Sequence, residues 1–186
     1  MNQIVPEEES SLNLEDQNIM VQSAVTPSFL DDFVMALKKD SSQKIGDFYH
    51  QWLRERIHDE SYELFNQGVV LSCCYGTLVY PYNKIKSNLP NLSIDELTRR
   101  NWGKWRIDLH PPKHVEDLKT LVWHLRNSLS HSLVSTQSDT GLIIKFVFED
   151  RPDENSDVNF RFIIGVNDLR QFIFKFGMGC LTGEWD

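Results

Sequence analysis

The sequence has few cysteines, no long apolar run and little positive charge, and each shortage excludes a class of protein. Its three cysteines include an adjacent pair and form no C-x-x-C motif, which argues against a disulfide scaffold and a structural zinc site. No stretch of about 18–20 apolar residues is present, so we expect no membrane span. The first nine residues lack the features of a secretory signal. We therefore expect a cytoplasmic protein with no metal and no cofactor.

The charge of the chain is negative overall but locally positive. A formal net charge of −8 over 186 residues disfavours a broad DNA-binding surface. The stretch from Arg99 to His131 nevertheless contains seven basic and three acidic residues, a local charge of +4, and four of the six histidines. This basic stretch is either an ordinary fluctuation of surface charge or a local anion-binding patch.

The hydrophobic pattern predicts a tail followed by helices. Residues 1–26 are expected to form an acidic, flexible tail because no period persists there, and residues 27–186 are expected to form a single domain. Apolar residues at helical spacing predict one long helix or two collinear helices over 28–57, starting at Thr26-Pro27. Residues 60–80 are apolar on most sides, which favours a buried helix over a strand. Ser93 is expected to cap a short helix over 94–100.

The second half of the chain adds one strong helix and a strand pair. Pro112 suits the first position of an amphipathic helix over 112–131. Its apolar face is formed by residues at helical spacing: Val115, Leu118, Val122, Leu125 and Leu129. The β-branched and aromatic segments 142–148 and 158–166, separated by a polar loop, predict a β-hairpin. A last helix is expected to follow Asn167-Asp168 and to end at Gly177 and Gly179. The predicted fold is therefore mainly α, a helical bundle with a C-terminal β-hairpin and a final helix.

The strongest chemical signal lies at the end of the 112–131 helix, where Arg126 precedes His131 by five positions. Arginine binds phosphate in a fixed fork and histidine exchanges a proton near neutral pH. The two side chains together suit phosphodiester cleavage, with one stabilising charge and the other transferring a proton. The simpler alternative is a surface arginine and histidine that favour the dipole of a helix end.

Helix geometry separates the directions of these two side chains. Five residues on a regular helix correspond to a rotation of about 140°. His124, Asn127 and His131 share one polar stripe, whereas Arg126 points elsewhere. Three arrangements stay open at this point: the helix frays near Ser130, the long Arg126 side chain swings around, or a second copy of the chain completes the site.

The segment from Leu121 to His131 resembles the signature of the HEPN superfamily, in which a polar residue follows the arginine, here Arg126-Asn127-x-x-x-His131. The segment from Gln67-Gly68 to Pro81 and the strands after the motif are similar to a plasmid-associated HEPN subfamily. The resemblance implies a helical bundle that dimerises, so the chain is expected to be HEPN-like over residues 27–186.

The same resemblance implies a metal-independent endoribonuclease with a toxin or phage-defence role. His131 would be the general acid or base, Arg126 the phosphate-binding residue, and Asn127 an orienting residue. Cleavage would use the RNA 2′-hydroxyl and leave a cyclic phosphate, so RNA would be the substrate and a homodimer the active form. Two alternatives stay open: a catalytically silent RNA-binding or scaffold module, and one half of a toxin–antitoxin pair whose partner regulates it.

Four further residues are weaker candidates for RNA contacts. His124 is positioned to line the cleft, Lys119 and Lys113 to contact the RNA backbone, and Trp105 to stack on bases. Solvated lysines, a capped histidine and a tryptophan that covers the end of the bundle are the simpler interpretations of the same residues.

Overall fold

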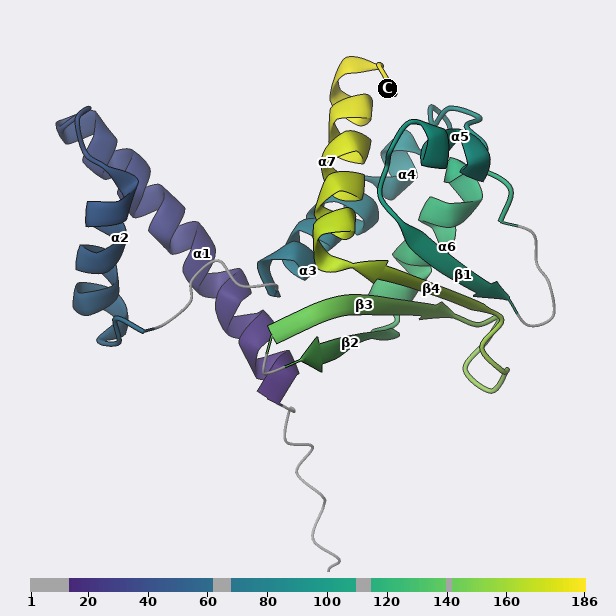
Figure 1. Ribbon diagram of the computed structural model, residues 1–186, viewed down its shortest axis with the longest axis horizontal. Helices are drawn as coiled ribbons and strands as arrows, with labels where there is room; N and C mark the ends of the chain where they lie inside the picture. The colour runs from purple at the N-terminus through teal and green to yellow at the C-terminus, as the bar shows by residue number, and fades with distance from the viewer. Residues whose placement is uncertain (1–13, 62–67, 110–114, 140–141) are drawn as a thin grey trace, which may run out of the picture. The chain divides into compact units, whose positions relative to one another are not determined.

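The chain divides into two compact units, Met1–Val69 and Val70–Asp186. The structure is a computed structural model, and it describes residues 14–61, 68–109, 115–139 and 142–186 (Figure 1). In this part of the chain, no helix is long and apolar enough to cross a membrane.

The first unit is a helical hairpin held by aromatic side chains. Helix α1 (Leu14–Lys39) is followed by α2 (Ile45–Trp52) and a π-helical turn, η1 (Leu53–Ile57). The Phe29 ring is buried with its centroid 5.4 Å from that of Trp52 and 5.6 Å from that of Phe48. The two helices therefore fold back on each other, and the prediction of one helix or two collinear helices is wrong. The predicted tail is also partly helical, because α1 begins at Leu14 and continues through Pro27.

The second unit contains a four-stranded antiparallel sheet, which corrects the predicted fold of a helical bundle with a β-hairpin. Its strands are β1 (Trp105–Leu109), β2 (Val134–Asp139), β3 (Leu142–Asp150) and β4 (Phe160–Gly165), in the order β1-β4-β3-β2. The predicted hairpin corresponds to β3 and β4, which pair as its two central strands. The outer strands escaped prediction because β1 follows an irregular stretch and β2 is mostly polar.

One face of the sheet is covered by two helices, α6 (Leu118–Ser130) and α7 (Val166–Thr182) (Figure 1). Alternate residues of a strand point to the same face. Phe146 and Phe148 of β3 are fully buried and pair with Ile164 and Phe162 of β4. These side chains form the core between the sheet and the helices.

The remaining helices of the chain are short. The helix expected over 60–80 is present in part but is not buried on most sides, since Tyr75 and Tyr80 are 40% and 81% exposed. The helical segment expected over 60–80 is present as α3 (Gly68–Cys74) and the π-helical turn η2 (Tyr75–Val79), while residues 62–67 lie outside the described residues. Helix α4 (Tyr82–Ile85) follows, and α5 (Ile94–Arg99) begins at a capping box formed by Ser93 and Glu96. This confirms the predicted cap at Ser93.

The final helix runs further than predicted. Helix α7 continues through Gly177 and Gly179 and ends at Gly183, whose φ of 76° is the left-handed conformation that glycine adopts without strain. Gly179 is buried because the Trp185 ring lies directly against it. The glycine therefore makes room for a tryptophan and does not end the helix.

Candidate functional site

The site is built on α6, whose start is set by a side-chain cap. The Asp117 carboxylate accepts a hydrogen bond from the backbone N–H of Thr120 at 2.8 Å, so the helix begins at Leu118. The helix was predicted to begin at Pro112, but residues 115–117 are not helical, so this prediction is wrong there. Residues 112–114 lie outside the described residues. The predicted apolar face is correct, because Leu118, Val122 and Leu125 are fully buried.

His131 is the residue at which α6 ends. Its backbone N–H donates to the carbonyl oxygen of Asn127 at 3.0 Å, and the next residue, Ser132, turns the chain with a φ of 54°. The His131 side chain is exposed and lines a pocket of about 440 Å³. The same pocket is lined by Arg151 and by residues of the loop that joins β3 to β4.

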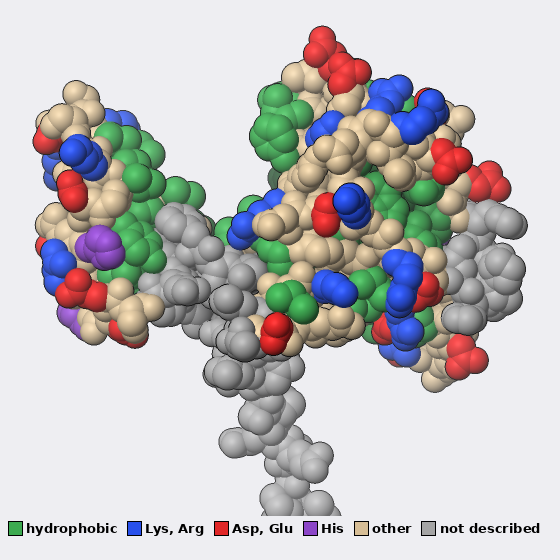
Figure 2. Space-filling model, in the orientation of Figure 1, with side chains coloured by type: hydrophobic (Ala, Val, Ile, Leu, Met, Phe, Trp, Pro, Cys, Tyr) green, Lys and Arg blue, Asp and Glu red, His purple; other side chains and the backbone are tan. Residues whose placement is uncertain are grey.

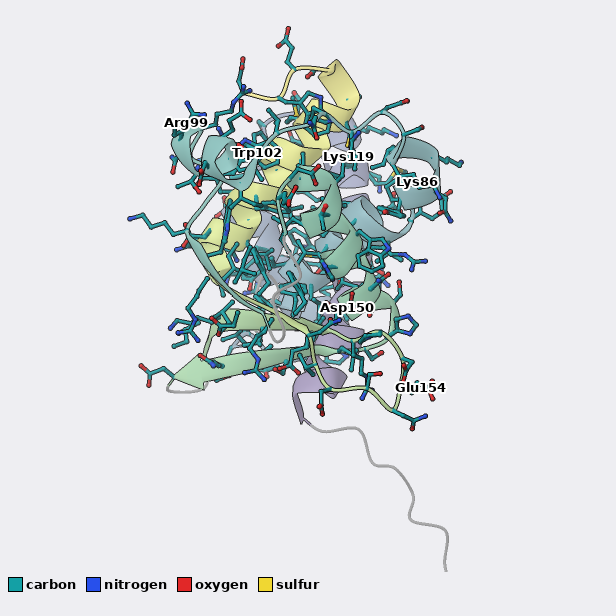
Figure 3. The ribbon with its side chains drawn as sticks, turned by 90° about the vertical axis from the view of Figure 1, so that its right-hand side faces the viewer. Lys86, Arg99, Trp102, Lys119, Asp150 and Glu154 are labelled. Carbon is teal, nitrogen blue, oxygen red and sulfur yellow. The ribbon has the colours of Figure 1, made fainter. Side chains whose placement is uncertain are left out.

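The loop beside His131 is held in place by its own acidic side chain. The two carboxylate oxygens of Asp153 accept hydrogen bonds from the Asn155 backbone N–H at 2.9 Å and from the Ser156 hydroxyl at 2.6 Å. These bonds, led by the one from Ser156, lower the pKa of Asp153. Glu154 is exposed and lies out on this loop (Figure 3). The pocket thus combines the guanidinium of Arg151 with the imidazole of His131.

Arg126 contacts Asn127 and Tyr82 and not the loop that borders His131. One of its guanidinium nitrogens donates to the side-chain oxygen of Asn127 at 3.1 Å, and the guanidinium lies 5.8 Å from the centroid of the Tyr82 ring. Burial raises the pKa of Tyr82, and the nearby Arg126 partly opposes this shift. Arg126 is not one of the described residues that line the His131 pocket. A single chain therefore does not bring Arg126 and His131 into one pocket.

A buried carboxylate connects the polar residues of α6 to the sheet. One oxygen of Asp150 accepts hydrogen bonds from His124 Nδ1 at 2.8 Å and from the side-chain amide of Asn127 at 3.2 Å. The other oxygen accepts the backbone N–H of Arg151 at 2.9 Å. Asp150 and His124 are only 3% and 2% exposed, and the His124 ring stacks on Phe160 with centroids 4.3 Å apart. Asp150 thus fixes Asn127, and through it Arg126, relative to the loop of the His131 pocket.

The other predicted RNA-contacting residues lie in three different places. Lys119 lies near the start of α6, about 18 Å along the helix axis from His131. The Trp105 ring packs against Phe162 and Phe172, with centroids 5.8 and 6.1 Å away. His124 is buried at the Asp150 contact, and Lys113 lies outside the described residues. The structure therefore does not gather these four residues around His131.

Two residues of the site, Asp150 and Arg151, were not among the candidates from sequence. Asp150 was assigned to the polar loop, although it continues the alternation of Phe146 and Phe148 along β3 and so faces the core. That alternation is the signal that could have found it. Among the described residues, no group of three or more His, Cys, Asp or Glu side chains is placed to hold a metal ion.

Arg126 and Asn127 lie on α6 and His131 ends it, so the segment that resembles the HEPN signature forms the end of a core helix. The family model described as HEPN pEK499 p136 matches residues 9–182, and the chain belongs to this family. No curated protein and no solved structure matches the chain significantly.

Proposed function

We propose that this HEPN protein is a metal-independent endoribonuclease with His131 as its proton-transferring residue. The observation that carries the proposal is the position of His131, which is exposed at the end of a rigid core helix and shares a pocket with Arg151. The pocket volume of about 440 Å³ is within the range of small-ligand sites. An imidazole beside a guanidinium is a pairing suited to phosphodiester chemistry.

The proposed reaction uses the ribose next to the scissile phosphate as its nucleophile. A base removes the proton from the 2′-hydroxyl, and the 2′-oxygen attacks phosphorus. The bond from phosphorus to the 5′-oxygen breaks, and that oxygen takes a proton from an acid. The products are a 2′,3′-cyclic phosphate and a 5′-hydroxyl, and His131 serves as one of the two proton-transferring groups. DNA, which lacks the 2′-hydroxyl, is not cleaved by this route.

The proposed active form is a homodimer in which the ends of two α6 helices face each other. This arrangement would bring Arg126 of one copy to the partner subunit's His131, whereas Arg126 does not line the His131 pocket of its own chain. Asn127 then orients Arg126 through the bond that already joins their side chains. Phe174, Met178 and Leu181 support an apolar interface, because they are 40–80% exposed and share one side of α7.

The proposed cellular role is that of a toxin or phage-defence effector under the control of an antitoxin or another regulatory protein. An acidic N-terminal segment, with five acids and no Lys or Arg over residues 1–30, is compatible with contacts to a basic partner or to the site itself.

The first test is the His131→Ala variant assayed on single-stranded RNA. General acid–base catalysis contributes about 10²–10⁴-fold, so we expect a loss of that size with an unchanged circular dichroism spectrum. His50→Ala is the matched control, because His50 is also exposed and lies in the first unit. Cleavage by His131→Ala at the parent rate, with contaminating nuclease excluded, would refute the proposal. RNA that is bound but never cut by the parent would indicate a silent RNA-binding module.

The second test asks whether two chains share the site. The Arg126→Ala and His131→Ala variants are each expected to be inactive. If Arg126 works with the partner subunit's His131, mixing the two variants forms heterodimers with one intact pairing, and part of the activity returns. An inactive mixture that still forms heterodimers by native mass spectrometry would show that each chain must supply both residues.

A further inference from the structure

A second pocket lies on the sheet, away from His131. It has a volume of about 470 Å³. It is lined by residues of all four strands, by Lys104 just before β1 and by Asp168 of α7. Its polar side chains include Lys104, Arg106, Gln137 and Lys145, and we call this surface the sheet groove.

The strand register explains why these cations share one face. Arg106 of β1 pairs with Ile163 of β4, and Lys145 of β3 pairs with Gly165, two residues further along β4. Residues two apart on a strand point to the same side, so Arg106 and Lys145 lie on the face opposite to the buried Phe162 and Ile164. The face that α6 and α7 leave uncovered thus carries the groove.

The charges in the sheet groove are only weakly compensated. Lys104 and Lys145 are exposed and make no ion pair with other described residues. Arg106 pairs with Asp108 at 3.0 Å, but its side chain is 70% exposed, so the pair is screened by solvent. The acid that lines the groove, Asp168, accepts the backbone N–H of Lys104. Figure 2 shows Lys and Arg side chains over the strands of the sheet.

The opposite end of the same sheet face is neutralised. There Arg161 donates to the Glu149 carboxylate, with a shortest distance of 2.6 Å, and the two residues are directly paired across β3 and β4. The groove therefore carries three cations, of which Arg106 is paired with Asp108, on a protein whose net charge is −8. A polyanion approaching the sheet meets an attractive surface there.

We propose that the sheet groove binds the phosphate backbone of single-stranded RNA, and this rests on the endoribonuclease function proposed above. The cations Lys104, Arg106 and Lys145 contact phosphates, and the Gln137 amide adds a hydrogen bond. The Trp105 ring also lines the groove, where it is half-buried and contacts the rings of Phe162 and Phe172. Recognition in the groove is electrostatic and independent of sequence, and it holds the strand while His131 acts elsewhere on it.

The test measures binding apart from cleavage. The full-length protein is titrated into a fluorescent single-stranded DNA of about 12 nucleotides, which is not cut, and anisotropy is followed between about 50 and 300 mM NaCl. Three phosphate contacts predict that log Kd rises with log salt with a slope of about 2, since each contact to a single strand contributes about 0.7.

The variant Lys104→Gln/Arg106→Gln/Lys145→Gln is expected to raise Kd at least about 10-fold at the lowest salt and to bring the slope close to zero. The matched control, Lys84→Gln/Lys86→Gln/Arg99→Gln, removes the same charge from exposed residues of α4, its C-cap and α5, and its binding should stay near that of the parent. A groove variant that binds like the parent, or a control that loses binding equally, would refute the proposal that the sheet groove binds the strand.

Cleavage assays separate this inference from the function on which it rests. With RNA as substrate, the groove variant is expected to have a raised KM and a kcat close to that of the parent. If the parent binds through the groove but never cuts RNA, the proposed endoribonuclease activity is refuted and RNA binding in the groove is not. If the parent cuts RNA and the groove variant has the same KM, only RNA binding in the groove is refuted.

Discussion

Removing the Asp150 carboxylate should destabilise the second unit strongly. Asp150→Ala deletes three hydrogen bonds, from His124, Asn127 and the Arg151 backbone, at a position that is 3% exposed. Each hydrogen bond to a charged group contributes about 1.5–3 kcal/mol, and a buried polar group left without its partner costs about 1–3 kcal/mol, so we expect the three lost bonds to cost about 4 kcal/mol together. His124 is such a buried group, since it is 2% exposed and makes its side-chain bond to Asp150.

The magnitude can be checked by urea unfolding. Four of the five tryptophans, Trp102, Trp105, Trp123 and Trp185, belong to the second unit, so fluorescence reports mainly on its unfolding. We expect the free energy of unfolding of this unit to fall by about 4 kcal/mol.

Two companion variants make the result specific to the buried contacts. Asp157→Ala removes an exposed acid from the same loop and should change the free energy of unfolding by less than about 0.5 kcal/mol. Asp150→Asn keeps an acceptor oxygen for His124 and should cost less than Asp150→Ala. A free energy of unfolding for Asp150→Ala within about 1 kcal/mol of the parent value would refute the reasoning that this carboxylate joins α6 to the sheet.

Three further predictions test other parts of the second unit. Gly103→Ala should lower the free energy of unfolding in urea by about 1–3 kcal/mol. The reason is that Gly103 has a φ of 114° and an added Cβ would lie 2.8 Å from a backbone oxygen of α7. A variant as stable as the parent would contradict this. Iodoacetamide should label the exposed Cys73 and spare Cys74 until the protein unfolds, because burial raises the pKa of the Cys74 thiol; equal rates by mass spectrometry would disprove the burial. Hydrogen bonds from the backbone N–H and the hydroxyl of Ser93 lower the pKa of Glu96 in the folded state, so their contribution to stability is present above the unfolded pKa of about 4.3 and is lost as pH falls. Glu96→Gln removes the titrating carboxyl and should flatten the Tm between about pH 6 and pH 3, and an unchanged pH profile would count against the capping box.

The sequence by itself determined the elements whose residue pattern is typical of a helix or a strand. Helix α6 was predictable because Leu118, Val122, Leu125 and Leu129 repeat at helical spacing, and all four are fully buried. The strands β3 and β4 were predictable because their residues are β-branched and aromatic and flank a polar loop. Arg126, Asn127 and His131 were recognisable as a motif because their order and spacing are properties of the chain alone, and the family match agrees with that recognition.

Tertiary structure alone decided how these elements combine. The strands β1 and β2 form because β4 and β3 offer them unpaired edges, and pairing between distant segments leaves little trace in a short polar stretch such as β2. The burial of Asp150 depends on the face of the sheet to which it points and on His124 meeting it there. The separation of Arg126 from the His131 pocket depends on the partners that each side chain finds in the folded chain. Contacts of this kind join residues that are far apart in sequence, so only the folded molecule determines them.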